Sequence, residues 1–273
     1  MTDKGAQAYS EHVMEIELLG SGTSHGVPVI GCSCPVCASK DQKDNRMRAS
    51  ALIRGNDGRT ILIDPGPEFR IQALRTGLAR LDAILATHAH ADHVHGLDDV
   101  RIFSRDHDIP LYCNAVCLED IKNRFDYIFK PTQEGGGKPH IALKEARGGE
   151  KFYAAGIEIT PITVMHGQLP VFGWRIGDAA YLTDCNGIPD GSIELLKGVK
   201  SLIIDGLRIR PHSTHFNFEG ALEQIQKINP DKAWLTHLCH DFTHAEIQDW
   251  LRKRVPGKKI EPAFDGLCIS IGR

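Results

Sequence analysis

The segment that most constrains the fold of this chain is residues 87–93, Thr-His-Ala-His-Ala-Asp-His. It begins at the last residue of an apolar run, 81–87, which predicts a short buried strand. Residues 92–97 predict a turn into a helix. The first two histidines then leave a strand end together, while the aspartate and the last histidine come from the turn and point into the same space. Imidazole and carboxylate groups bind Zn, Mn, Fe and Ni, so the segment predicts a site that can hold two metal ions. A histidine-rich surface loop is the alternative.

Three further candidate ligands, His166, Asp184 and His237, each follow a short apolar or β-branched run. Functional residues of α/β proteins lie at such strand ends, so we expect these side chains to meet the histidine-rich segment. Taken singly, each has an ordinary alternative, a core or surface histidine or a turn aspartate. The ordered set favours ligands, because closing two coordination spheres needs neutral imidazoles and ionised carboxylates in a fixed number.

Taken together, the ordered set resembles the metallo-β-lactamase superfamily, from about Glu15 to the C-terminus. Asp64, in the segment Ile-Leu-Ile-Asp-Pro-Gly, also matches an early strand-end aspartate of that superfamily, which would orient the ligands. The resemblance implies that one metal is held by His88, His90 and His166 and the other by Asp92, His93 and His237, with Asp184 bridging them opposite a hydroxide. It implies an α/β fold, the four-layer αβ/βα metallo-β-lactamase sandwich, with both metals at strand ends along one edge.

A second cluster, Cys32, Cys34 and Cys37, places three thiols in one loop. Thiolates at this spacing can converge on one structural zinc, and a closed tetrahedral site needs a fourth ligand. His240 is the candidate, because it stands three residues after His237. The alternatives are a disulfide with a spare thiol, or three unrelated cysteines. The start of the chain does not resemble a signal peptide, so we expect a cytoplasmic protein, in which a disulfide is disfavoured.

The cysteine cluster narrows the resemblance, since most metallo-β-lactamase-like hydrolases lack it. Together with Thr-His-Leu-Cys-His at 236–240 and Phe-Asp-Gly at 264–266, it resembles the PhnP-type phosphodiesterases of phosphonate metabolism. A cysteine-rich loop also occurs in the PqqB-like branch, which does not keep an intact His-Ala-His-Ala-Asp-His motif. The intact motif therefore favours a working hydrolase.

A third segment, 205–218, lies between a predicted buried strand and a predicted amphipathic helix. In PhnP-type and tRNase Z-like enzymes a histidine just before this helix faces the scissile phosphate. His215 fits that place best, and His212 is the second candidate. Such a histidine would stabilise phosphoryl oxygens or protonate the leaving oxygen, and Arg208 is a candidate phosphate ligand. A solvated polar loop is the alternative.

The predicted function follows from the two active-site metals, Zn or Mn. A hydroxide held between two divalent ions attacks phosphorus in line, and Asp92 would orient it while acting as a ligand. His215 would assist the departing alkoxide. The expected reaction is hydrolysis of a small phosphodiester, cyclic or open and of the nucleotide or ribose-phosphate kind, to a phosphomonoester.

Other functions remain as alternatives. A tRNase Z usually inserts a long basic arm between the ligands that match His166 and Asp184, and the short interval here disfavours it. A glyoxalase II-like thioesterase carries an added helical domain, for which the chain after His237 is short, and a lactonase is a further possibility within the fold. A non-catalytic nucleotide-binding metal module belongs to a different class. An open two-metal centre with His215 beside it disfavours such a module.

Length and charge add the remaining expectations. The 273 residues suffice for one large domain at 14–273 after a polar, flexible N-terminus at 1–13. A net charge of −3 disfavours a surface for large nucleic acids, and no apolar run is long enough for a membrane span. A homodimer is expected from the resemblance alone. The local patterns predict helices at 67–79 and 114–129, a hairpin turn at 55–58 and a loop-rich connector at 130–150.

Overall fold

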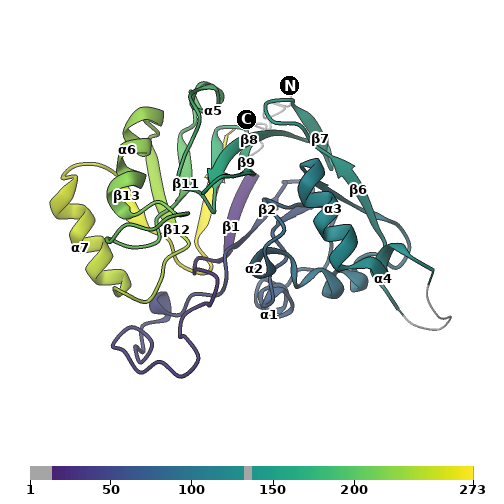
Figure 1. The fold of residues 1–273 in the computed structure, drawn as a ribbon, viewed down its shortest axis with the longest axis horizontal. Coiled ribbons are helices and arrows are strands. Elements are labelled where there is room, and N and C mark those ends of the chain that lie inside the picture. Colours follow the sequence, from purple (N-terminus) through teal and green to yellow (C-terminus); the bar gives the residue numbers. More distant parts are fainter. Residues whose placement is uncertain (1–13, 132–136, 273) are drawn as a thin grey trace, which may run out of the picture.

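Two seven-stranded sheets form the centre of the molecule, which the computed structural model describes over residues 14–131 and 137–272. Figure 1 shows the two sheets face to face with helices on their outer sides. The first sheet has the order β14 (Cys268–Ile271), β1 (Met14–Gly20), β2 (Ser50–Arg54), β3 (Thr60–Ile63), β4 (Ala83–Leu85), β5 (Ile109–Cys113) and β6 (Ile141–Glu145). The second has the order β13 (Ile260–Pro262), β12 (Lys232–Thr236), β11 (Ser201–Asp205), β10 (Ala179–Leu182), β9 (Leu169–Ile176), β8 (Ile157–His166) and β7 (Phe152–Ala154). The predicted αβ/βα sandwich is confirmed.

Helices cover the outer face of each sheet. The first sheet carries α1 (Phe69–Arg75), α2 (Ala91–Val94), α3 (Ala115–Arg124) and α4 (Asp126–Phe129), with two 3-10 helices, η1 (Gln42–Asp44) and η2 (Leu97–Ile102), elsewhere along the same half of the chain. The second carries α5 (Asp190–Leu195), α6 (Phe218–Ile228) and α7 (His244–Arg254). Three buried apolar clusters result, one between the sheets and one under each helical layer.

The clearest sequence-to-structure correspondence is α6. Its apolar residues recur at helical spacing, and Phe218, Leu222 and Ile225 are buried against the second sheet. Asn217 begins the helix by accepting a hydrogen bond from the backbone N of Gly220. The helix therefore starts just before the predicted amphipathic stretch and places segment 205–217 at the edge of the sheet.

Several predicted boundaries differ from the structure. The helix predicted at 67–79 is only α1, because Thr76 and Gly77, with φ +62°, end it early. The helix predicted at 114–129 breaks at Phe125 into α3 and α4. The connector at 130–150 is wrong in part, because it contains β6, an edge strand that pairs in parallel with β5. The hairpin turn at 55–58 is confirmed between antiparallel β2 and β3. The predicted flexible N-terminus at 1–13 lies outside the described residues.

The parallel strands determine where functional side chains gather. In the first sheet β3, β4 and β5 run parallel, and in the second β10, β11 and β12 do so. Their carboxyl ends meet along one edge of the sandwich, which is where α/β proteins place their sites. Over the described ranges, none of the helices combines the length and apolar character that a bilayer crossing requires.

Candidate metal centre

The structure brings all seven predicted active-site ligands together at that edge. One group of mutually close ligand atoms comes from His88, His90, His166 and Asp184, and a second comes from Asp92, His93, Asp184 and His237. Within each group the candidate atoms lie within 4.8 Å of one another. Asp184 belongs to both groups, as a bridging ligand would. This grouping is the one that the sequence predicts.

Asp184 lies between the two groups, two residues after the end of β10, and is 2% exposed. Its Oδ2 lies 3.1 Å from Nε2 of His93 and 3.8 Å from Nε2 of His88. Its Oδ1 lies 3.1 Å from Nε2 of His237. The two carboxylate oxygens thus face ligands of both groups, so a single side chain can serve two ions.

Asp64 orients the ligand His93 and also Thr87, the residue just before the ligand His88. Its Oδ1 accepts a hydrogen bond from the backbone N of Thr87 at 2.8 Å, and its Oδ2 accepts one from the Thr87 hydroxyl at 2.8 Å. The same Oδ2 lies 2.8 Å from Nδ1 of His93. Because Nδ1 is engaged, Nε2 of His93 is the atom left to face the metal position. Asp64 is fully buried and has φ 56°, an uncommon conformation for a residue other than glycine.

Backbone and hydroxyl groups orient two more imidazoles. Nδ1 of His166 lies 2.9 Å from the carbonyl oxygen of Thr214, and Nδ1 of His88 lies 2.9 Å from the hydroxyl of Thr87. In both cases Nε2 is the nitrogen available to a metal. Hydrogen bonds of this kind fix the tautomer and the ring plane of metal-binding histidines.

The polar groups fit metal ions better than they fit one another. His237 is fully buried, yet its Nδ1 has no hydrogen-bond partner among the described residues, and its Nε2 faces Oδ1 of Asp184 at 3.1 Å without the geometry of a hydrogen bond. Nε2 of His88 and Nδ1 of His90 point at each other across 2.9 Å. Such orphaned nitrogens are costly unless a cation satisfies them, and neutral imidazoles with ionised carboxylates suit Zn or Mn.

The site also stabilises positive charge. Burial lowers the pKa of His237, but the neighbouring carboxylates, Asp184 first, outweigh it and raise the pKa to about 10. Burial likewise opposes protonation of His93, and Asp184, Asp64 and Asp92 together raise its pKa well above the usual value. At His88 burial prevails, and the pKa lies well below the usual value. A pocket that stabilises protons in this way also attracts divalent cations.

His215, the predicted phosphate-facing residue, lies against this centre. Its ring centroid is 4.6 Å from that of His237 and 4.8 Å from that of His166. Its Nδ1 lies 2.7 Å from Oδ2 of Asp205, which also accepts a hydrogen bond from the backbone N of Cys185. Asp205 was missed by the sequence analysis, although its place at the end of β11 was a usable signal. Asp205 and His215 also form a third group of mutually close ligand atoms with Asp184 and His237, but the contact between Nδ1 of His215 and Asp205 occupies one of the two ring nitrogens.

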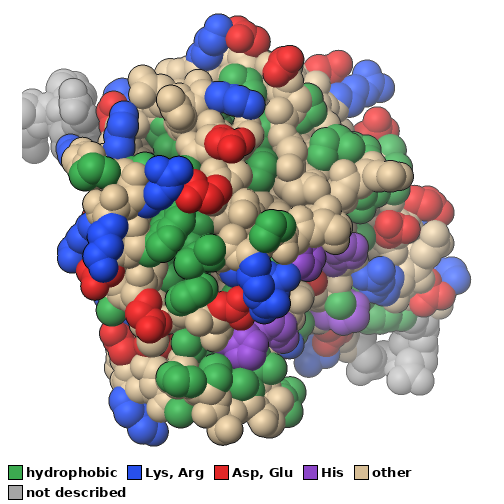
Figure 2. Space-filling model, turned by 60° about the vertical axis from the view of Figure 1, so that its left-hand side comes forward, with side chains coloured by type: hydrophobic (Ala, Val, Ile, Leu, Met, Phe, Trp, Pro, Cys, Tyr) green, Lys and Arg blue, Asp and Glu red, His purple; other side chains and the backbone are tan. Residues whose placement is uncertain are grey.

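The other two predicted substrate-binding residues lie further out on the same segment. His212 is exposed, and its ring centroid lies 5.0 Å from that of His215. Burial, then His215 and Arg208, lower the pKa of His212. Nε of Arg208 is buried and has no hydrogen-bond partner in the described part of the chain. Figure 2 shows histidine side chains gathered in one part of the surface, next to basic side chains.

The second predicted metal site is also assembled. Sγ of Cys32, Cys34 and Cys37 lie 3.5, 3.5 and 3.4 Å from Nδ1 of His240. Zinc bonds of ordinary length at a tetrahedral angle place sulfur and nitrogen about 3.6 Å apart, so these distances suit one zinc ion. The backbone N of Cys37 donates to Sγ of Cys34 and is the main reason that the pKa of this thiol falls to about 6. All the cysteines are free, as the zinc prediction requires.

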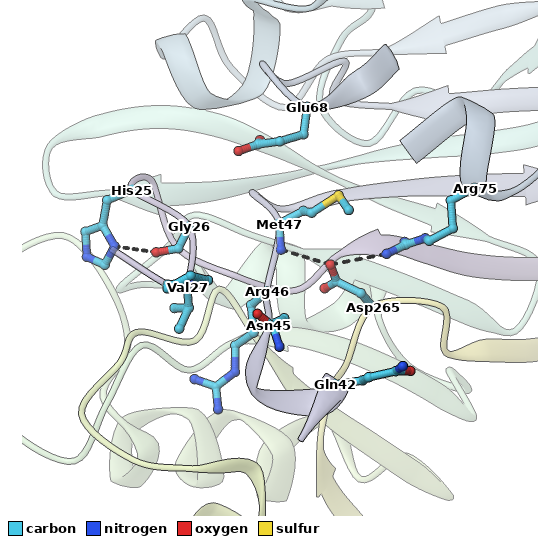
Figure 3. A pocket seen from close by; sticks show the side chains of 11 residues that line it. His25, Gly26, Val27, Gln42, Asn45, Arg46, Met47, Glu68, Arg75 and Asp265 are labelled. Carbon is cyan, nitrogen blue, oxygen red and sulfur yellow. Dashed lines mark hydrogen bonds and ion pairs between the residues drawn. The ribbon is translucent and has the colours of Figure 1, made fainter. Parts of the chain in front are cut away.

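A surface depression of about 540 Å³ lies beside this cysteine loop (Figure 3). Its charged groups are already paired within the protein. Arg75 points to Asp265, whose carboxylate also accepts the backbone N of Met47, and Glu68 pairs with Arg48. The depression therefore marks where the loop is anchored.

Comparisons with known proteins agree with the geometry. A family model described as "Beta-lactamase superfamily domain" matches residues 59–238. A crystal structure of a "New Diphosphatase from the PhnP Family" is 38% identical, covers 95% of this chain and 97% of its own, and superposes with a TM-score of 0.86. Zn²⁺-bound PqqB from Methylobacterium extorquens is 18% identical, with 93% and 99% coverage and a TM-score of 0.78, which shows likeness of fold alone.

The curated relatives include a longer protein. An octanoyltransferase from Porphyromonas gingivalis is 41% identical over 93% of this chain. The chain spans about half the length of that relative, 51% of it.

Proposed function

The chain belongs to the metallo-β-lactamase superfamily, and on that premise we propose that it is a metal-dependent hydrolase of the PhnP type that acts as a phosphodiesterase. The proposed substrate is a small phosphodiester, cyclic or open and of the nucleotide or ribose-phosphate kind. The proposed product is a phosphomonoester. The observation that carries the proposal is the position of His215, held by Asp205, beside two complete groups of ligands.

The ligand groups would hold two divalent ions, which supply a hydroxide at neutral pH and neutralise charge on the phosphoryl oxygens when bound. Asp184 would bridge them, and Asp92 would bind one while fixing the direction of attack. Asp64 keeps His93 aimed at the second position through its Nδ1 contact. The chain's own task is thus to hold the ligands in place before substrate arrives.

His215 has the geometry of a group that assists the leaving oxygen. Because Asp205 engages Nδ1, Nε2 is the nitrogen left to contact a phosphoryl or leaving oxygen. Such a proton donor typically accelerates a reaction by about 10²–10⁴-fold. The alternative assignment to His212 is less well supported. Its Nδ1 contacts only the backbone N and the hydroxyl of Thr214, both at the long distance of 3.3 Å, and it has no carboxylate partner among the described residues.

Substrate size follows from what surrounds the centre. Only β9 lies between the strands that carry His166 and Asp184, which leaves no extended arm there for binding a large RNA. Arg208 at the rim supplies positive charge for one further phosphate, and His212 can donate a hydrogen bond to it through Nε2, because its Nδ1 accepts the backbone N of Thr214. The relative called a diphosphatase supports phosphoryl compounds as the substrate class.

A second candidate reaction is hydrolysis of an acyl thioester or ester. The observation that favours it is the octanoyltransferase relative, although this chain matches only about half of that protein. The same metal-bound nucleophile could attack an acyl carbon.

The test combines metal analysis with turnover of bis-p-nitrophenyl phosphate. The purified chain is stripped with a chelator, reloaded with Zn²⁺ or Mn²⁺, and assayed on the diester and on an octanoyl thioester. We expect about three metals per chain, two active-site ions and one zinc held by cysteines, and diester turnover restored by one ion. Metal binding without diester turnover under either ion would overturn the phosphodiesterase proposal, and turnover of the thioester alone would replace it.

A further inference from the structure

One short turn carries ligands of both metal sites. His237 follows β12 and belongs to the second active-site group, and His240, three residues later, belongs to the cysteine group. The backbone between them therefore cannot move at one site without moving at the other.

His237 also has an unusual backbone. Its φ is 59°, in the left-handed region that residues with a Cβ atom seldom adopt. Such a conformation persists only where the surrounding structure determines it. The position of this ligand is therefore maintained by its neighbours and not by its own conformational preference.

Backbone contacts hold one side of the turn. The N of Leu238 donates to the carbonyl oxygen of Ser21 at 2.9 Å, and the N of Thr23 donates to the carbonyl oxygen of Leu238 at 3.2 Å. The N of Cys239 donates to the carbonyl oxygen of Leu207 at 3.1 Å. These contacts fix Leu238 and Cys239, the residues between the two histidines, but leave the carbonyl oxygen of Cys239 to another donor.

Arg46, in the stretch that follows the three cysteines, is the donor to this oxygen and to one beyond His240. It is 1% exposed, and its guanidinium donates to the carbonyl oxygens of Cys239 and Phe242, which lie on either side of His240. Asp44 balances the charge at 3.4 Å, and its Oδ1 also accepts the backbone N of His244 at 2.6 Å. A buried ion pair thus joins the loop that carries the three cysteines to the turn that carries both histidines.

We propose that occupancy of the cysteine site and occupancy of the active-site position held by Asp92, His93 and His237 are thermodynamically coupled through this turn, with Arg46 as the positioning residue. Zinc at the cysteines restrains His240, the restrained turn keeps His237 in its left-handed conformation, and the active-site ion binds more tightly. The coupling is reciprocal by linkage, so the active-site ion tightens zinc by the same factor. The proposal requires both metal sites but not the phosphodiesterase reaction.

The experiment measures Mn²⁺ binding by electron paramagnetic resonance, because Mn²⁺ prefers imidazole and carboxylate ligands to thiolates. The wild-type protein, stripped mildly so that only the cysteine-bound zinc remains, is compared with Cys34→Ser, which cannot close that site. We expect one of the two Mn²⁺ ions to bind about tenfold more weakly in the variant, within the usual range of such couplings. The ion held by His88, His90 and His166 should be unaffected.

A second variant tests the route. Arg46→Lys keeps the charge beside Asp44 but cannot donate to both carbonyl oxygens, so the same Mn²⁺ ion should weaken. Arg54→Lys is the matched control, because Arg54 also pairs with one carboxylate, Glu17, and one carbonyl oxygen, that of Thr76, far from the turn. Its Mn²⁺ binding should equal that of the wild type.

The reciprocal measurement uses no variant and decides the matter if Cys34→Ser fails to fold. Zinc affinity of the wild-type cysteine site is measured by chelator competition with and without saturating Mn²⁺. A zinc affinity about tenfold higher with Mn²⁺ supports the coupling. Equal zinc affinities would overturn it, whether or not the protein hydrolyses phosphodiesters.

Discussion

The imidazole of His215 stacks on that of His237, with ring centroids 4.6 Å apart and 14° between the ring planes. One ring belongs to the second ligand group, and the other is held by Asp205. The proposed proton donor and a candidate metal ligand thus lie face to face, so replacing the first tests its role separately from that of the ligand groups of Asp184.

Replacing His215 by Ala should lower kcat by about 10²–10⁴-fold while metal content stays at the wild-type value. The measurement is steady-state turnover of bis-p-nitrophenyl phosphate together with metal analysis of the same preparation. His212→Ala is the control and should change kcat much less. Loss of metal in the His215 variant would show that this residue is a ligand after all.

Replacing Asp64 by Asn should weaken the active-site metals by about 10–100-fold, because an amide cannot accept all the hydrogen bonds that this carboxylate receives. Those bonds come from Thr87 and His93. Titration with Zn²⁺ in a competing chelator measures the change. Asp82→Asn, which alters a carboxylate that accepts the backbone N of Thr60, should leave metal affinity unchanged. An equal loss in both variants would point to general destabilisation.

Removing the metals should lower the thermal midpoint. An ion that binds only the folded chain adds about 2.7 kcal/mol of stability at one hundred times its dissociation constant. Thermal melts in chelator and after addition of Mn²⁺ and Zn²⁺ measure the difference. The prediction fails if the midpoint is the same with and without metal.

Replacing Thr243 by Ala should cost about 1 kcal/mol of unfolding free energy, because its hydroxyl caps α7 by accepting the backbone N of Glu246. Denaturant titration measures this cost. Asp249→Ala, an exposed acid on the same helix, should cost much less.

Thr243 and Glu246 form a capping box, in which the Glu246 carboxylate accepts hydrogen bonds from Thr243. This carboxylate makes the stability of the protein depend on pH. Hydrogen bonds from the backbone N and then the hydroxyl of Thr243 lower the pKa of Glu246. Its contribution is therefore fully present above the unfolded pKa, about 4.3, and is lost as pH falls through the lower folded pKa. The difference in denaturant midpoint between wild type and Glu246→Ala should be constant near neutrality and shrink below about pH 4.3. A difference independent of pH would contradict this.

Local patterns predicted the elements that bury long apolar stretches and missed those that depend on distant partners. Strand β4 and helix α6 were recognisable because their apolar residues follow the period of the element. Strand β6 was not, because it is a short edge strand whose pairing with β5 decides its conformation. The break between α3 and α4 at Phe125 was likewise missed, because no glycine or proline marks it in the sequence.

What the sequence alone determined was the chemistry of the centre, since metal ions require particular side chains and these stand in order at the ends of recognisable strands. Only the tertiary structure decided how they are held. The contact of Asp205 with His215 lies within one segment but depends on how that segment folds back at the end of β11, and the contact of Arg46 with the turn after His237 joins segments far apart in the sequence. The physical reason is that ligand identity is set by the side chain itself, whereas orientation is set by whichever buried donor or acceptor the fold brings within reach.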